Sequence, residues 1–254
     1  MSKWELYDAL IESIPSEARV EYCCRGTWQS YVETQEGAGL ASLLLTGRTP
    51  YSEACLWDRW HSRSLRDLAA LWRSWEPQEA ALGTAALTAW HTGRQPSTPD
   101  RDPAGPPQRW DVFQLLRRRC QDKTVSVVGH FRGAECLRET AGRFLVFERE
   151  PREGDYPDTA EEFLLPGSDV VILTGMTLTN KTLPRLLELA QGAFVAVTGP
   201  SVPLAPLLFS FGVDALFSMT VRDTAACRQA VRSPEGRTFL ACVEKTELWR
   251  DKTF

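Results

Sequence analysis

The pattern of hydrophobic and polar positions in the C-terminal part of the chain alternates between two types of segment. Short runs of consecutive apolar residues predict buried strands at Thr124–Val128, Phe144–Phe147, Val170–Leu173, Phe194–Val197 and Ala215–Phe217. Amphipathic segments predict helices near Trp110–Cys120, Gly133–Thr140, Thr182–Gln191, Leu204–Phe211 and Thr224–Val231. Continuous apolar strands that alternate with helices are typical of a parallel sheet covered on both faces. The pattern therefore predicts an α/β fold with a Rossmann-like, mostly parallel sheet, and a last strand near Thr238–Val243 at its edge.

The N-terminal part has a shorter and more mixed pattern. After a predicted helix near Lys3–Ile14, glycines separate three strand-like runs, which favours a meander of Arg19–Arg25, Trp28–Glu33 and Leu40–Leu45. The segment "SLRDLAALWRSW" predicts a helix capped by Ser64. A second helix, "EPQEAALGTAALTAW", is rich in small residues, which allow its backbone to lie close to a neighbouring helix or to a ligand.

A proline-rich segment separates these two patterns. Residues 93–109, "GRQPSTPDRDPAGPPQR", contain five prolines and two glycines, a composition that prevents a regular helix or strand. The sequence thus predicts a small α+β domain over residues 1–92, a linker over 93–109 and the Rossmann-like domain over 110–254.

Composition and charge exclude several classes of partner. The 254 residues carry a net charge of −4 and no basic footprint of a nucleic-acid-binding protein. The chain starts without the apolar segment of a signal peptide, and no apolar run approaches the ~20 residues of a membrane span. Seven scattered cysteines without a C-x-x-C motif are typical of reduced thiols. We therefore expect a cytoplasmic protein that binds neither nucleic acid nor membrane; a homodimer is compatible with the sequence.

The residues that follow the first two predicted strands are the first candidates for a binding site, because open parallel sheets bind ligands beyond the carboxyl ends of their strands. Gly129, His130 and Phe131 follow the first strand, and Glu148 ends the second. His130 is a candidate metal ligand or proton carrier. Glu148 could bind hydroxyl groups or a cation, and Asp155 is either a ligand-binding residue or the first residue of an Asx turn. The dinucleotide fingerprint and the phosphate loop are absent, which disfavours a nucleotide-binding regulator.

Small polar residues follow the next two strands. They are Thr174, Gly175, Thr177 and Asn180 after the third strand, and Gly199, Pro200 and Ser201 after the fourth. Their side chains offer hydrogen bonds without charge, and a helix that begins after Ser201 would present free N–H groups to an anion. Capping of the next helix by Asn180 or Thr182 accounts for one of these residues. The remaining small polar residues are more than helix capping requires, and they predict a ligand-binding site.

Taken together, these segments resemble a known family. "VVGHF", "FEREPREGDYPD", "DVVILTGMTLTNKTL" and "VTGPSVPLAPLLF" resemble the C-terminal domain of the putative heavy-metal chelation family of bacterial and archaeal proteins, and "GAGLAS" with "AALGTAALTAW" resembles the small domain that precedes it. The resemblance implies a domain similar to the small domain of enolases, a Rossmann-like domain, and a site in the cleft between them. Arg132 stands where the family often has proline, and Thr88 where asparagine is expected.

The resemblance implies binding of a metal ion or a metal–chelator complex, and the strand ends also suit a small polar anionic ligand. His130 and Glu148 are the candidate ligands of a divalent metal or metal chelate. One histidine and a few carboxylates suit a hard cation, or a metal already held by an organic ligand, better than a closed cage for a soft metal. The alternative is an enzyme that acts on a small polar metabolite, with His130 or Glu148 as acid or base.

Overall fold

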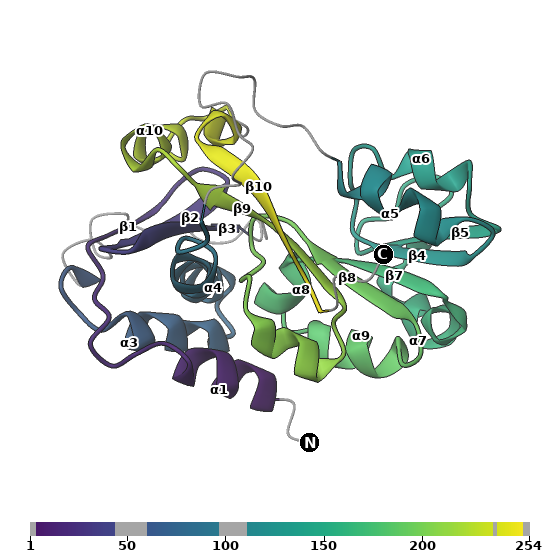
Figure 1. Ribbon diagram of the computed structural model, residues 1–254, viewed down its shortest axis with the longest axis horizontal. Coiled ribbons are helices and arrows are strands. Elements are labelled where there is room, and N and C mark those ends of the chain that lie inside the picture. The colour runs from purple at the N-terminus through teal and green to yellow at the C-terminus, as the bar shows by residue number, and fades with distance from the viewer. Residues whose placement is uncertain (1–3, 44–59, 97–110, 236–237, 251–254) are drawn as a thin grey trace.

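The structure, a computed structural model, describes residues 4–43, 60–96, 111–235 and 238–250 (Figure 1). It confirms the predicted α/β fold, with a small antiparallel sheet followed along the chain by a larger, mostly parallel one. Residues 97–109 of the predicted linker, and the ends of three predicted elements at Lys3, at 44–45 and at Trp110, lie outside the described residues. No described helix is long and apolar enough to cross a membrane.

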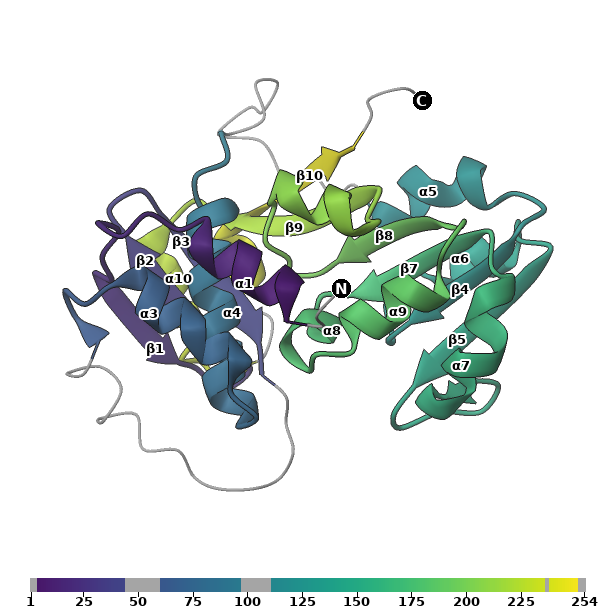
Figure 2. The ribbon, with the colours of Figure 1, turned by 90° about the horizontal axis from the view of Figure 1, so that it is seen from below.

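The small sheet is the predicted meander, in the order β1-β2-β3 with antiparallel pairing. Its strands are β1 (Tyr22–Arg25), β2 (Gln29–Thr34) and β3 (Gly37–Ser42). One of its faces is covered by α1 (Glu5–Glu12), α3 (Leu65–Ala70), the 3₁₀ turn η1 (Leu71–Arg73) and α4 (Pro77–His91), as Figure 2 shows. Ser64 caps α3 as predicted, since its hydroxyl accepts the N–H of Asp67.

The small residues of α4 serve close packing. Every residue from Ala80 to Ala89 is buried. A Cβ atom added to Gly83 would lie 2.2 Å from the backbone nitrogen of Trp72, and one added to Gly39 on β3 would lie 2.0 Å from that of Ala89. Of the two interpretations of this helix, the structure therefore supports contact with neighbouring elements rather than with a ligand.

The large sheet has the strand order β10-β9-β8-β7-β4-β5-β6. Its strands are β4 (Thr124–Val128), β5 (Arg143–Glu148), β6 (Tyr156–Pro157), β7 (Val170–Thr174), β8 (Phe194–Thr198), β9 (Ala215–Val221) and β10 (Val243–Trp249). All neighbours are parallel except β9 and β10. Read from β6 to β9, this is the 3-2-1-4-5-6 order of doubly wound sheets, with its switch point between β4 and β7.

Helices cover both faces of the large sheet (Figure 1). On one face lie α5 (Val112–Cys120) and α6 (Glu135–Arg138). On the other lie α7 (Glu161–Leu164), α8 (Met176–Thr179) and α9 (Leu183–Leu189), with the 3₁₀ turns η2 (Asp158–Ala160), η3 (Leu165–Gly167) and η4 (Pro206–Phe211). Helix α10 (Thr224–Ala230) and the turn η5 (Thr238–Ala241) join β9 to β10.

Two elements differ most from the sequence-based expectation, whereas others, such as β3, which was expected at Leu40–Leu45, are shifted by a few residues. The last strand is Val243–Trp249 rather than Thr238–Val243, because seven consecutive residues from Val243 onward pair with β9 while 238–241 close a 3₁₀ turn. The helix expected at Leu204–Phe211 is the 3₁₀ turn η4, with Pro206 in its first turn. The segment between β5 and β7, which the hydrophobic pattern left without regular structure, contains β6, η2, α7 and η3.

Candidate functional site

The carboxyl ends of β4 and β5 are joined by one side chain. Gly129 turns the chain after β4 with a φ of 105°, a conformation that glycine adopts without strain. The next residue, His130, donates its backbone N–H to Oε1 of Glu148 at 2.8 Å, and Oε2 of the same carboxylate accepts the N–H of Arg149 at 3.0 Å. Two backbone donors therefore fix the orientation of the Glu148 carboxylate.

The imidazole of His130 lies between two carboxylates. Its Nε2 is 2.6 Å from Oδ2 of Asp155, whose side chain is 8% exposed, and its Nδ1 is 3.7 Å from Oε1 of Glu148. Asp155 also accepts the backbone N–H of Arg152 at 2.8 Å, so it closes a local turn and contacts the histidine at once. Donation from Nε2 to Asp155 leaves the lone pair of Nδ1 on the side of Glu148.

His130 and Glu148 line a cavity of about 300 Å³, the switch-point cavity, at the carboxyl ends of β4, β5 and β7, whereas Asp155 contacts His130 from outside the lining. Of the predicted residues, Gly129, His130, Glu148, Thr174, Thr177 and Asn180 line it. Its described lining runs from Val128 to Thr182, and none of it comes from the N-terminal part of the chain. The described residues thus place this cavity at the switch point of the large sheet, whereas the resemblance implied a cleft between the two domains.

Glu161 on α7 is a lining residue that the sequence reasoning missed. Burial, and then the nearby Asp158 carboxylate, raise the pKa of Glu161 from its usual 4.5 to about 7, although Arg149 opposes the shift. The only sequence signal was the acidic run that follows Asp155, and it gave no indication that the chain returns to the strand ends.

Within the crossing after β7, the polar side chains bond first to the crossing itself. Thr177 donates its hydroxyl to the carbonyl of Thr174 at 2.7 Å, and the hydroxyl of Thr174 accepts the N–H of Met176 at 3.3 Å. The side-chain oxygen of Asn180 accepts both the N–H and the hydroxyl of Thr182. Thr182 stands at the N-cap of α9 and makes no side-chain cap, so Asn180 organises the turn before the helix.

The same crossing also forms hydrogen bonds with the N-terminal part of the chain, through residues 178 and 179. The carbonyl of Leu178 accepts hydrogen bonds from Nε1 of Trp72 at 3.0 Å and from the hydroxyl of Tyr7 at 3.4 Å. The hydroxyls of Thr179 and Thr84 lie 3.1 Å apart in the buried contact between α8 and α4. Among the polar side chains of this stretch, that of Thr179 is therefore explained by packing against α4.

Of the other predicted residues, Asp155 contacts His130 without lining the switch-point cavity, and five lie apart from it. Phe131, Gly199 and Pro200 line a second cavity of about 250 Å³ on the α5 face of the sheet. Ser201 and Gly175 line neither cavity. The Ser201 hydroxyl, 1% exposed, accepts the N–H of Ser42 at 2.8 Å, and a Cβ atom on Gly175 would lie 2.8 Å from a methyl group of Val202.

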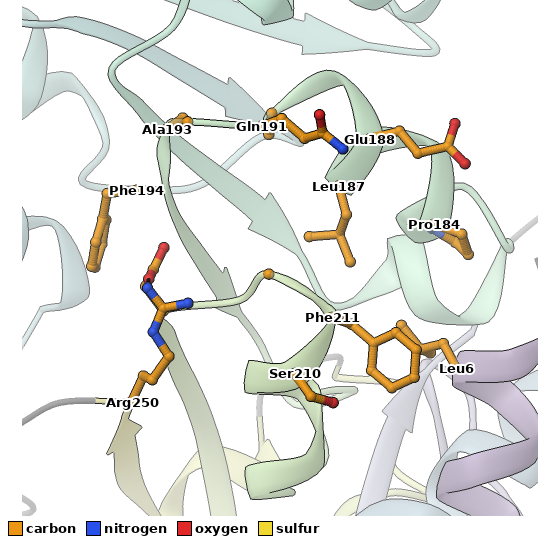
Figure 3. Close-up of a pocket in the computed structure, with 14 residues that line it drawn as sticks. Leu6, Pro184, Leu187, Glu188, Gln191, Ala193, Phe194, Ser210, Phe211 and Arg250 are labelled. Carbon is orange, nitrogen blue, oxygen red and sulfur yellow. Dashed lines mark ion pairs between the residues drawn. The ribbon is translucent and has the colours of Figure 1, made fainter. Parts of the chain in front are cut away.

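A larger cavity, of about 580 Å³, lies at the amino end of β8, away from all of these residues (Figure 3). Leu187 and Phe211 contribute apolar surface to it. Its charged side chains are already paired, Arg250 with Asp214 and Glu188 with Arg185. Each charged side chain in its described lining is therefore already used in an ion pair.

The donor groups also limit which metals the protein could hold. Among the described residues, no three His, Cys, Asp or Glu side chains are arranged to enclose a metal ion. Burial raises the pKa of both Cys23 and Cys120 to about 12, so these thiols are protonated at neutral pH and are poor ligands for soft metals.

Comparisons with known proteins agree with the fold. Two family models, both described as "putative heavy-metal chelation", match residues 7–91 (DUF4213) and 111–248 (DUF364). A crystal structure of a DUF364-family protein of unknown function from Desulfitobacterium hafniense is 32% identical, with a TM-score of 0.85 over 97% of this chain and 98% of that one. Another, from Pyrococcus horikoshii, is 22% identical, with a TM-score of 0.78 over 98% and 100% of the chains, a likeness that concerns the fold.

An uncharacterized protein of Methanocaldococcus jannaschii is 32% identical over 120 residues. The match covers 44% of this chain and 46% of that protein, so it spans less than half of the relative. The two family models together extend over both sheets of the structure. This chain is a member of the DUF364/DUF4213 family, whose description is putative heavy-metal chelation.

Proposed function

We propose that the switch-point cavity binds a divalent metal ion that a small organic chelator already holds, with His130 and Glu148 as the protein ligands. The observation that supports this most directly is the 3.7 Å between Nδ1 of His130 and Oε1 of Glu148. Metal–nitrogen and metal–oxygen bonds of about 2.0–2.2 Å at angles between square and trigonal place two ligand atoms about 3–3.7 Å apart. The two atoms therefore have a separation that a shared cation would require.

Asp155 supports the same interpretation. A metal-binding histidine commonly donates its second ring N–H to a carboxylate, which fixes the ring and strengthens the ligand. The 2.6 Å contact between Nε2 of His130 and Asp155 has this form. Asp155 is thus proposed to position His130 rather than to contact the metal.

Two protein ligands leave most coordination positions open, which favours a metal complex over a bare ion. Thr174, Thr177 and Asn180 line the cavity and can contact the polar groups of a chelator without adding charge. The carboxylates of Glu148, Asp158 and Glu161 outnumber the single cation, Arg149. This balance favours a cationic complex and disfavours a free anion in the cavity.

The test compares binding of Ni²⁺ and of its cationic complex with diethylenetriamine by calorimetry, with metal analysis of the recovered protein. We expect His130→Ala and Glu148→Gln each to weaken binding by more than about 100-fold, because a ligand is lost, and Asp155→Asn to weaken it by about 10–100-fold, the typical cost of removing an outer partner. His61→Ala is the matched control, since the ring of His61 contacts the carbonyl of Glu21 in the N-terminal part of the chain. Equal affinity in all four variants would exclude His130 and Glu148 as ligands.

An enzyme remains the second candidate, supported by the same pair of side chains. A histidine whose ring is oriented by a carboxylate is a common general base, and Nδ1 of His130 faces the cavity side occupied by Glu148. A metabolite screen would then show turnover that His130→Gln abolishes while the folded state is retained. Turnover that survives in His130→Gln would contradict this alternative.

A further inference from the structure

Glu161 differs from the other carboxylates that line the switch-point cavity, because it lacks a partner. Glu148 accepts the backbone N–H groups of His130 at 2.8 Å and of Arg149 at 3.0 Å. Asp158 forms an ion pair with Arg149, at 3.6 Å between Oδ2 and Nε. Glu161 forms neither a hydrogen bond nor an ion pair within the part of the chain that the structure describes. It is therefore the lining carboxylate that is left for a ligand.

The surroundings of Glu161 make its negative charge unfavourable in the empty cavity. The residue lies on α7 and is partly buried, so its carboxylate loses part of its hydration. This burial, with the nearby Asp158 carboxylate, is the reason for its raised pKa. A carboxylate in such a position gains most from a positively charged hydrogen-bond donor, which replaces the lost water and offsets the like charge.

The next residue on the same helix has the opposite surroundings. Glu162 accepts a hydrogen bond from Nε of Arg185 at 2.8 Å, and it does not line the cavity. Two adjacent carboxylates on α7 thus carry the same charge, one paired away from the cavity and one in its lining. The pair allows the effect of position to be separated from the effect of charge.

The other polar groups of the lining limit the chemistry of a chelator. The hydroxyl of Thr177 and the side-chain oxygen of Asn180 already bond within the crossing after β7. Arg149 already faces Asp158, so a chelator with carboxylates would meet like charges without a free cation to balance them. A chelator with amine nitrogens would instead bring N–H groups to Glu161, and coordination to a metal makes these N–H groups stronger donors.

We propose that Glu161 selects the chelator by accepting a hydrogen bond from an amine N–H of the bound complex, so that the ligand is a metal–amine complex rather than a metal–polycarboxylate complex. This inference rests on the proposed function and names the class of chelator. Glu161 is not assigned as a ligand of the metal, since no three His, Cys, Asp or Glu side chains among the described residues are arranged to enclose an ion.

The test uses calorimetry on the full chain with two Ni²⁺ complexes of equal charge, one with diethylenetriamine and one with its pentamethyl derivative, which has no N–H. We expect the wild type to bind the first complex about three- to tenfold more tightly, the range of a charge-assisted hydrogen bond in a half-exposed site. Glu161→Leu should remove this preference, and Glu161→Gln should reduce it, because a neutral amide oxygen is a weaker acceptor. Glu162→Gln is the matched control and should keep the preference.

Two results in the variants would overturn the inference. A preference that survives in Glu161→Leu would show that the bulk of the methyl groups causes it, and an equal loss in Glu162→Gln would show a general effect of net charge. Equal affinity of the wild type for the two complexes, with both lost in His130→Ala, would overturn this inference and leave the proposed metal site intact. Failure of both complexes to bind the wild type would overturn the metal site as well.

Discussion

The crossings after β7 and after β8 begin alike and have different roles. Both start with a threonine and a glycine at the end of a buried strand, followed by Thr177 and Asn180 in the first crossing and by Ser201 in the second. In the first, Thr174, Thr177 and Asn180 line the switch-point cavity. In the second, Ser201 is enclosed against the backbone of Ser42. The difference teaches that polar residues at a strand end predict hydrogen bonds, whereas the identity of the partner depends on what packs there.

The N-terminal part of the chain is the origin of this difference. It contacts the first crossing from behind, through Trp72 and Tyr7, and leaves its other side to the cavity. At the second crossing, Ser42 of the N-terminal part donates its N–H to the Ser201 hydroxyl, which would otherwise be available to a ligand. The two contacts can be separated by substitutions that act on stability at one crossing and on binding at the other.

The largest effect is expected from Trp72→Ala, which removes a fully buried ring behind the first crossing. We predict a loss of about 3–5 kcal/mol in the free energy of unfolding, measured by urea denaturation, because a cavity remains and the Leu178 carbonyl keeps only the longer hydrogen bond from Tyr7. Trp72→Phe keeps most of the ring and removes the N–H donor, and should cost about 1–2 kcal/mol. A loss below 1 kcal/mol for Trp72→Ala would show that the ring does not support the crossing.

An intermediate effect on stability is expected at the second crossing. Ser201→Ala leaves the N–H of Ser42 without its acceptor and should lower the free energy of unfolding by about 1–2 kcal/mol. It should leave binding of the Ni²⁺–diethylenetriamine complex unchanged, since Ser201 does not line the switch-point cavity. Asn180→Ala should weaken that binding, with a stability loss of about 1 kcal/mol or less. If Ser201→Ala weakened binding and Asn180→Ala lowered mainly the stability, the roles given to the two crossings would be wrong.

The smallest effect is expected at Glu161, and it depends on pH. Its pKa is raised to about 7 in the folded protein, so the folded state holds the proton more tightly than the unfolded chain. This contribution to stability is complete below about pH 4.5 and is lost as the pH rises through 7. At pH 8, Glu161→Gln should therefore have a higher melting temperature than wild type. The gain in the free energy of unfolding should be no more than about 1 kcal/mol, because solvent screens this partly exposed group. An equal gain at pH 4.5 would point to a cause other than ionisation.

The sequence by itself determined the fold class, because hydrophobic periodicity is local. Each continuous apolar run, such as Val170–Leu173, became a strand of the large sheet, and the glycine-punctuated runs before it became the small meander. The strand ends also identified His130 and Glu148 as neighbours, since the carboxyl ends of adjacent parallel strands meet at one edge.

Only the tertiary structure decided which polar groups share a cavity. Asp155 reaches His130, and Glu161 reaches the same strand ends, because β6, η2 and α7 return the chain to the sheet through contacts that no local pattern encodes. Likewise, the Ser201 hydroxyl is buried in a hydrogen bond with the backbone N–H of Ser42, 159 positions away in the sequence. The physical reason is that one residue's environment is set by long-range packing, whereas its secondary structure follows largely from its immediate neighbours.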